Sequence, residues 1–154
     1  MDFHLHLATE LAQRAHPAIP VCVEPQSTVR VVLREMQRLN RGAVLVCRDG
    51  VLAGVFTERD ALRLLARGAD LDVPIEQVMS PRPVCLTPSD SVGSAITKMS
   101  QGGYRRLPVV DEQGRPIGIV KVSGILHYLV EHFPSVVYTL PPQPDPATQE
   151  REGA

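Results

Sequence analysis

Apolar residues recur along this chain with two alternating periods, one typical of strands and the other of helices. Residues 21–23 form a short apolar run, and an apolar stripe with helical spacing follows at Val29, Val32, Leu33, Met36 and Leu39. Residues 43–47 are almost uniformly apolar and predict a buried strand. Asp49-Gly50 is typical of a two-residue hairpin turn, and residues 51–56 return as the partner strand.

A second helix is predicted to begin at Thr57 and to end at Gly68, which readily takes the left-handed conformation of a helix terminus. The unit therefore reads strand, helix, strand, strand, helix. Residues 74–81 then predict one helical turn bounded by prolines, which is a linker of fixed shape.

The same order of elements is predicted again in the second half of the chain. Residues 84–86 form a short strand, and a helix begins at Asp90 or Ser91. A second hairpin follows. The final helix, which Ser123 is expected to cap, is stopped by Pro134.

Direct identities show that the two halves are copies of one unit. Residues 20–25 are echoed by residues 83–88, which lie 63 positions later. The echo then resumes at an offset of 64, at which Val46 matches Val110, so we place one inserted residue before the middle strand of the second copy. A duplicated unit of this length predicts that the copies pack on each other, because each half alone is too small for a sizeable core.

Four segments follow from this organisation. Residues 1–16 are expected to form an N-terminal helical extension, and residues 17–80 the first unit with its linker. Residues 81–134 form the second unit. Residues 135–154 are a proline-rich tail in which Val136 to Tyr138 could add a strand and whose end is expected to be disordered.

Charge and hydropathy exclude several classes of function. The net charge is −1 and the sequence pI about 6.5, so the chain lacks the basic field that nucleic-acid binding requires. No apolar run is long enough to span a membrane, and the opening residues do not resemble a secretory signal. The sequence predicts a cytoplasmic protein with no nucleic-acid or membrane partner.

The three cysteines, Cys22, Cys47 and Cys85, are odd in number and lack a C-x-x-C spacing. We expect them to be small buried hydrophobic residues, and a redox or metal role is the alternative. His4 and His6 are poorly placed to share a metal, as are His127 and His132, so no metal site is predicted.

Thr57 and Asp60 are the candidate binding pair. A hydroxyl at a strand end and helix start lies beside free backbone N–H groups that suit phosphate, and a carboxylate one turn later can accept hydrogen bonds from two ribose hydroxyls. The same Thr-x-x-Asp spacing is also that of a capping box, which needs no ligand. Both interpretations stay open at this stage.

Three motifs give the chain a resemblance to the CBS domain family, and specifically to a tandem CBS pair, or Bateman module. They are residues 54–60 (GVFTERD), 78–84 (VMSPRPV) and 106–111 (RLPVVD). The resemblance implies an α+β fold in which two CBS motifs, each β-α-β-β-α, pack with pseudo-twofold symmetry and often pair with a second copy as a homodimer. It also implies clefts between the motifs that hold AMP, ADP, ATP or S-adenosylmethionine.

The same resemblance assigns a ligand site that combines residues of both units. Its members are Thr57, Asp60, Pro83, Val84, Cys85, Tyr104, Arg105 and Arg106. Pro83 to Cys85 would flank the base. The arginines would face phosphate, or else lie at a solvated or carboxylate-paired strand end. Tyr104 would stack on a purine or only cover apolar surface.

The second unit carries a damaged version of the binding motif. Lys121 stands where the first unit has Thr57, and Gly124 stands in place of Asp60, so the ribose loses its acceptor. The second, degenerate site is assigned to Ile19, Pro20, Ala43, Lys121 and Ser123. We expect it to be empty or specialised, which leaves one competent site in each chain.

No constellation of nucleophile, base or paired carboxylates indicates catalysis, so the chain is not expected to be an enzyme or to need a cofactor. The sequence instead predicts a stand-alone regulatory module that binds an adenosyl ligand and signals to an unknown regulated protein. The alternative is a ligand-free structural dimer or interaction adaptor.

Overall fold

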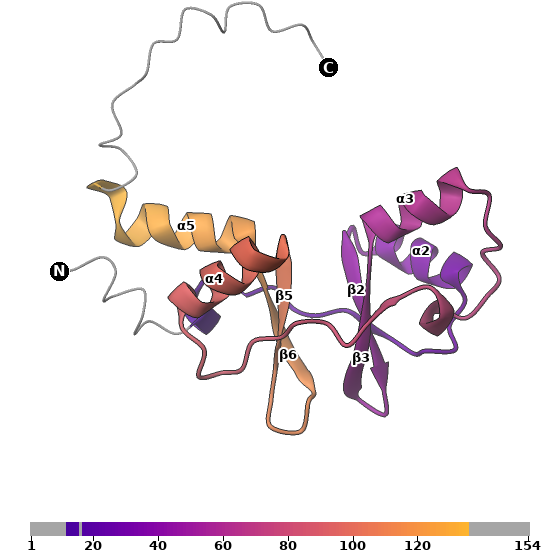
Figure 1. Cartoon of the computed structure of the whole chain (residues 1–154), viewed down its shortest axis with the longest axis horizontal. Coiled ribbons are helices and arrows are strands. Elements are labelled where there is room, and N and C mark those ends of the chain that lie inside the picture. The colour runs from indigo at the N-terminus through magenta and orange to yellow at the C-terminus, as the bar shows by residue number, and fades with distance from the viewer. Residues whose placement is uncertain (1–11, 16, 136–154) are drawn as a thin grey trace, which may run out of the picture.

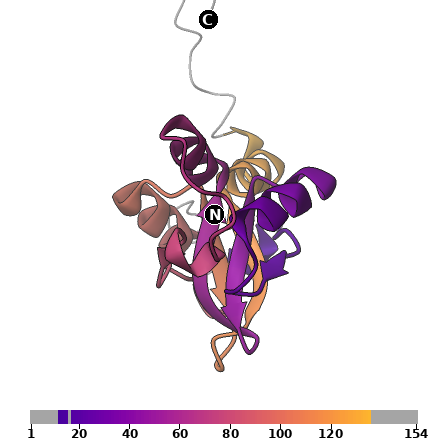
Figure 2. The same ribbon diagram turned by 90° about the vertical axis from the view of Figure 1, so that its right-hand side faces the viewer.

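The two copies of the unit stand side by side (Figure 1). The computed structural model describes residues 12–15 and 17–135 of the 154-residue chain. Two β-hairpins occupy the middle, with α2 (Val29–Arg38) and α3 (Glu58–Ala66) beside one and α4 (Val92–Gly102) and α5 (Val122–His132) beside the other. Figure 2, the view at right angles, shows both hairpin turns at the end of the molecule opposite the helices. The expected α+β fold is confirmed.

The first copy forms the elements that its pattern predicts. They are β1 (Cys22–Val23), α2, β2 (Ala43–Arg48), β3 (Val51–Thr57) and α3. Helix α2 begins after Thr28, whose hydroxyl accepts a hydrogen bond from the Val31 N–H at 3.3 Å. The predicted turn between β2 and β3 has positive φ at both residues, 53° at Asp49 and 80° at Gly50, as a type I′ hairpin requires.

The second copy has α4, β5 (Arg106–Val110), β6 (Pro116–Lys121) and α5, with two departures from expectation. The strand predicted at residues 84–86 shrinks to a single parallel bridge between Leu86 and Val109. Prolines 83, 88 and 108 surround this pairing and lack the N–H that a longer ladder needs.

The predicted cap of the last helix is also wrong. Strand β6 runs directly into α5, so Lys121 occupies the N-cap position and Ser123 is already the second helical residue. A lysine side chain has no acceptor, and this helix start has no side-chain cap.

Each half completes the sheet of the other. The linker between the copies forms a short 3₁₀ turn, η2 (Ile75–Gln77), and then β4 (Ser80–Pro81), which pairs with β3 of the first copy. In the reverse direction, Ala18, at the start of the first copy, pairs with Ile119 on β6 of the second. Its backbone N–H and C=O bond to Ile119 at 2.8 and 3.0 Å.

Strand register corrects the position of the inserted residue. Ala43 pairs with Thr57 in the first hairpin, and Arg106 pairs with Lys121 in the second. The middle strands therefore still correspond at an offset of 63, and only the following strands correspond at 64. Val46 matches Val109, not Val110 as the sequence suggested, because the extra residue lies within the second hairpin.

Three apolar clusters hold the molecule together. One lies between the first sheet and its helices around Val44, Val46 and Phe56, and a second lies in the other half around Leu107 and Val120. The third joins the halves through Leu45, Cys47 and Ile119, with Ala18, Leu52 and Val55 packed against them. This shared cluster fixes the relative position of the two hairpins.

Part of the N-terminal extension belongs to the second half. Residues Ala12–Arg14 form a 3₁₀ turn, η1, and Ala12 and Ala15 are buried in the cluster around Leu107. The Ala12 N–H donates to the Asp90 carbonyl at 2.9 Å. The remainder of the predicted helix, the strand at residues 136–138 and the proline-rich tail lie outside the described residues.

Two equivalent strand glycines give a test of this packing. A Cβ added at Gly54 would overlap the sulfur of Met79, whereas one added at Gly118 would lie in ordinary contact, 3.4 Å from Cβ of Pro17. Gly54→Ala is expected to reduce the free energy of unfolding by about 1–3 kcal/mol. Urea denaturation of both variants checks this, with Gly118→Ala as the control. The cost should shrink when Met79 is also replaced by alanine, and an equal cost in both backgrounds would contradict the assigned contact.

Candidate functional site

A cleft with a volume of about 390 Å³ opens between the two halves. This volume falls in the range of sites for small molecules, roughly 300–1,000 Å³. Its apolar walls come from both hairpins, and its polar side chains come from α3, from the segment after β4 and from β5. The residues that line it are Ala43, Leu45, Val55, Thr57, Arg59, Asp60, Arg63, Ser80, Pro81, Arg82, Pro83, Val84, Tyr104, Arg106, Pro108 and Ile119.

Most of the residues predicted from the sequence meet in this cleft. Thr57, Asp60, Pro83, Val84, Tyr104 and Arg106 all line it. Arg105 instead lines a smaller neighbouring hollow of about 230 Å³, together with Thr57 and Tyr104. Cys85 does not line either cavity, because its thiol turns to the carbonyl oxygen of Pro83, 3.1 Å away.

Thr57 and Asp60 form a complete capping box at the start of α3. The Thr57 N–H and hydroxyl donate to Oδ2 of Asp60 at 2.9 and 3.0 Å, and the Asp60 N–H approaches the Thr57 hydroxyl at 3.5 Å. Within the described residues, Oδ1 of Asp60 accepts no hydrogen bond. One oxygen of the carboxylate therefore caps the helix while the other is available to the cleft.

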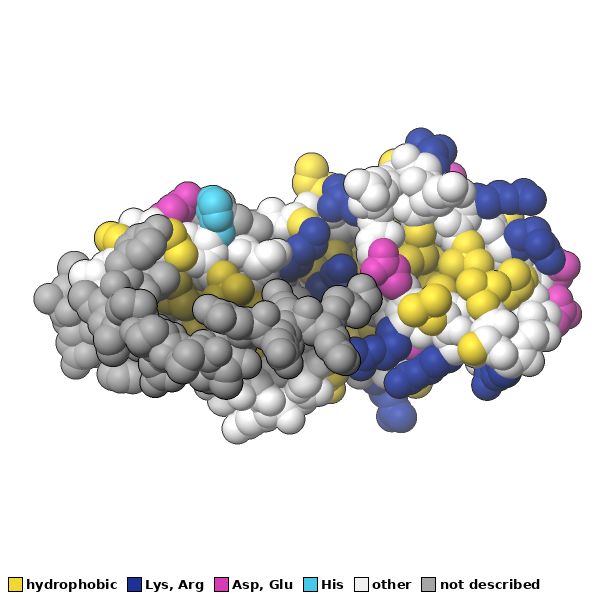
Figure 3. All heavy atoms as spheres, turned by 90° about the horizontal axis from the view of Figure 1, so that it is seen from above, with side chains coloured by type: hydrophobic (Ala, Val, Ile, Leu, Met, Phe, Trp, Pro, Cys, Tyr) yellow, Lys and Arg dark blue, Asp and Glu magenta, His cyan; other side chains and the backbone are white. Residues whose placement is uncertain are grey.

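Three arginines of the cleft were not identified from the sequence. Arg59 and Arg63 lie four residues apart on α3, and Arg82 lies just after β4. The spacing of Arg59 and Arg63 places them on the same face as each other, which the sequence alone could have shown. Arg82 gave no such signal, because a separate segment of the chain brings it to the cleft. Figure 3 shows basic side chains gathered between the two halves.

Two glycines that do not themselves line the cleft make room for two of its side chains. The ring of Tyr104 lies so close over Gly102 that a Cβ there would overlap it, and the ring is 41% exposed. A Cβ at Gly42 would lie 2.6 Å from Nη2 of Arg106. Gly42 and Gly102 thus leave the room that these two cleft side chains occupy.

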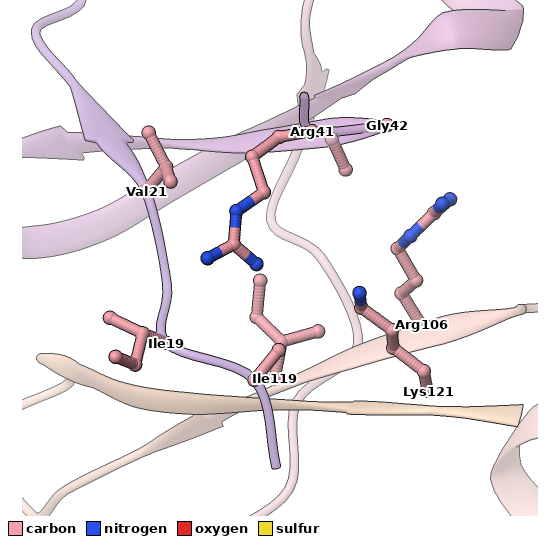
Figure 4. A pocket seen from close by; sticks show the side chains of 9 residues that line it. Ile19, Val21, Arg41, Gly42, Arg106, Ile119 and Lys121 are labelled. Atoms are coloured by element: carbon pink, nitrogen blue, oxygen red, sulfur yellow. The ribbon is translucent and has the colours of Figure 1, made fainter. Parts of the chain in front are cut away.

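The second, degenerate site is almost closed. Its cavity is about 20 Å³, enough for about one water molecule and far too small for a nucleoside. Of the predicted members, Ile19, Ala43 and Lys121 line it, and Pro20 and Ser123 do not. Arg41, which was not identified from the sequence, also lines the pocket, and its guanidinium points into it toward Ile119 (Figure 4).

The cysteines differ from one another in exposure. Cys47 is buried, and burial together with its interaction with Cys22 raises the pKa of its thiol to about 12, so it stays protonated at neutral pH. Burial also raises the pKa of Cys85. Cys22 is exposed, contrary to the expectation of a buried residue.

The described residues contain neither a metal-binding cluster nor a membrane-spanning helix. No cluster of His, Cys, Asp and Glu there could hold a metal ion. No described helix is both long and apolar enough to cross a membrane.

Comparison with known proteins agrees with this architecture. The model of the CBS domain family matches residues 17–67 and 75–131. The CBS domain-containing protein YhcV of Bacillus subtilis is 39% identical over 104 residues, which are 67% of this chain and 74% of that protein.

Two solved structures share the arrangement of the pair. A CBS domain protein from Pyrobaculum aerophilum, complexed with AMP, is 26% identical with a TM-score of 0.70 over 79% of this chain and 98% of its own. The CBS domain pair of protein MJ0100, in complex with 5′-methylthioadenosine and S-adenosyl-L-methionine, is 22% identical with a TM-score of 0.69 over 77% of this chain and 98% of its own, a likeness of fold. With two family matches in tandem and the same pairing of halves, the chain belongs to the CBS domain family as a tandem CBS pair.

Proposed function

We propose that this protein is a regulatory module that binds an adenosyl ligand in the cleft between its halves. The observation that carries the proposal is the open side of the Asp60 carboxylate, which lines a cleft of ligand size beside the N-terminus of α3. Ribose hydroxyls would donate to Oδ1 of Asp60, and a phosphate would lie against the helix N-terminus near Thr57. The apolar walls, including Val55 and Ile119, would hold the base.

Binding and capping are compatible in this arrangement. The capping box uses Oδ2 of Asp60 and leaves Oδ1 without a hydrogen bond among the described residues. The capping interactions also fix the rotamer of Asp60 before any ligand arrives. A preformed acceptor loses less conformational freedom on binding than a mobile one.

A ligand in this cleft would contact both halves at once. Thr57 and Asp60 belong to the first copy, whereas Tyr104 and Arg106 belong to the second. A bound ligand would therefore favour one relative position of the halves over another. The size of this effect equals the difference between its binding free energies for the two positions, about 1–3 kcal/mol. We infer a role in signalling to a partner protein, without catalysis by this chain.

The alternative function is that of a ligand-free structural dimer or adaptor. It is favoured by the complete capping box, which satisfies Thr57 without a ligand, and by the closure of the second pocket. It predicts that no adenosyl compound alters the thermal stability of the protein.

Exposed apolar side chains on two helices support self-association under either function. Leu62 on α3 is 67% exposed, and Leu126, at the equivalent position of α5, is 57% exposed. We propose that a second copy covers these side chains, with α3 of each chain against α5 of the other, because this arrangement is self-complementary.

Calorimetry with the purified chain tests ligand binding. AMP, ADP, ATP and S-adenosylmethionine are each titrated, and at least one is expected to bind and to raise the melting temperature. Asp60→Asn should weaken this binding tenfold or more, because the amide has one acceptor oxygen where the carboxylate has two. Its NH2 group cannot accept hydrogen bonds from the ribose hydroxyls. Unaltered affinity in Asp60→Asn would remove Asp60 from the site.

Two substitutions of Asp60, compared without ligand, separate its capping role from its role in binding. Asp60→Ala is expected to lower the free energy of unfolding by about 0.5–2 kcal/mol, because the Thr57 N–H loses its partner. Asp60→Asn keeps an oxygen for that N–H and should cost less. Urea denaturation without ligand measures both, and equal stability of Asp60→Ala and the wild type would contradict the cap.

Light scattering after size-exclusion chromatography tests the dimer. The wild type is expected to have twice the mass of one chain, and Leu62→Glu combined with Leu126→Glu should yield monomers, because buried carboxylates would lack partners. Ile117→Glu, on the hairpin at the opposite end, is the control and should remain dimeric. A monomeric wild type, or a double variant that stays dimeric, would exclude this interface.

A further inference from the structure

The charge of the cleft distinguishes among ligands that its shape admits equally. Four arginines line it, Arg59 and Arg63 from α3, Arg82 from the segment after β4, and Arg106 from β5. Asp60 is the one carboxylate among the lining residues. The basic groups therefore converge from three separate segments on a single cavity.

None of these four guanidinium groups has an ion-pair partner within the described part of the chain. Some arginines elsewhere on the surface are paired, Arg30 with Asp72 at 2.8 Å and Arg48 with Glu76 at 2.6 Å. A cleft in which four unpaired positive charges outnumber one carboxylate, with low-dielectric walls, concentrates anions. The side chains that line this cleft therefore carry a net positive charge.

The backbone at Arg82 supports the same interpretation. Its φ is +48°, a left-handed conformation that is uncommon for residues other than glycine, asparagine and aspartate. A hydrogen bond from the Arg82 N–H to the Ala53 carbonyl, at 3.1 Å, holds it there. Strained residues of this kind occur often at ligand clamps.

Arg106 lines the cleft and also the two neighbouring cavities. Its guanidinium lies against Gly42, where a side chain would collide with it. The carboxyl carbon of Glu58 lies near the same point, 3.2 Å from the position a Gly42 Cβ would take, without forming an ion pair with Arg106. Arg106 lines both the cleft and the neighbouring hollow that Glu58 lines, and among the described residues it forms no ion pair.

We propose that this cleft selects nucleotides with a di- or triphosphate chain over AMP and over S-adenosylmethionine. The inference rests on the proposed function, since the ribose end is taken to be held by Asp60. Each added phosphate gives the planar guanidinium groups further oxygens for paired, charge-assisted hydrogen bonds. S-adenosylmethionine carries a sulfonium and an ammonium group against a single carboxylate, and the four arginines disfavour its net positive charge.

Calorimetry at physiological salt with the full chain tests the selection. Adenosine, AMP, ADP, ATP and S-adenosylmethionine are titrated in turn, and affinity is expected to rise with each phosphate, by at least tenfold from AMP to ATP. The difference should shrink at high salt, because screening weakens the contacts of exposed arginines. S-adenosylmethionine should bind more weakly than adenosine.

Substitution assigns the effect to particular side chains. Arg63→Gln combined with Arg82→Gln is expected to reduce ATP affinity tenfold or more and to leave adenosine affinity unchanged. Arg115→Gln removes a charge from the turn between β5 and β6. Arg115 lines none of these cavities, so this variant should alter neither ATP affinity nor adenosine affinity. Circular dichroism confirms that the variants are folded.

The outcomes separate this inference from the proposed function. Equal affinity for AMP and ATP, tighter binding of S-adenosylmethionine, or ATP affinity that survives the double substitution would overturn the selection while adenosyl binding stands. If no adenosyl compound binds, the proposed function fails, and inorganic tripolyphosphate then decides the inference. Tripolyphosphate binding that the double variant loses would support a polyphosphate site, and no binding would overturn it.

Discussion

The structure depends on a reciprocal exchange of short segments between its halves. Strand β4, which leads into the second copy, hydrogen-bonds to β3 of the first, and Ala18, which leads into the first copy, hydrogen-bonds to β6 of the second. An exposed strand edge needs partners for its backbone N–H and C=O groups, and here each half supplies them to the other. The shared cluster around Leu45 and Ile119 forms where these segments meet.

Because of this exchange, the two clefts lie at equivalent places in the fold, although one is open and the other almost closed. Both lie where a strand runs into a helix of one copy and faces the leading segment of the other. In the first, Thr57 and Asp60 satisfy the helix start, and arginines stand around an open volume. In the second, Lys121 leaves the helix uncapped, and Arg41 points into what space remains. The side chains at these two positions, and not the order of elements, make the two clefts differ.

Sequence patterns predicted those features that depend on neighbours along the chain. The Asp49-Gly50 turn and the helix start at Thr57 are local, and both are present. Ser123 was misassigned because the strand before α5 has no break, so the helix begins two residues earlier than a serine cap requires. The inserted residue was misplaced because its position follows from the register of the paired strands. Identical residues in the two copies do not reveal that register.

The candidate site was predictable where motif and fold coincide, and not where separate segments converge. Six of the eight expected residues line the cleft, because the order of elements determines where strand ends meet. Arg82 could not be found this way, since its contribution depends on a left-handed backbone in a linker. Cys22 was expected inside and lies outside, because β1 is the edge strand of its sheet and one of its faces is left open.

The exchanged segments have a further consequence for how such a molecule can originate. One copy alone would present an unpaired edge where β4 or Ala18 now binds, and a second identical copy could fill it by donating its own leading segment. The present chain has the geometry of such a strand-swapped dimer with its two subunits joined end to end. Joining them allowed each subunit to change separately, so one cleft could close while the other stayed open.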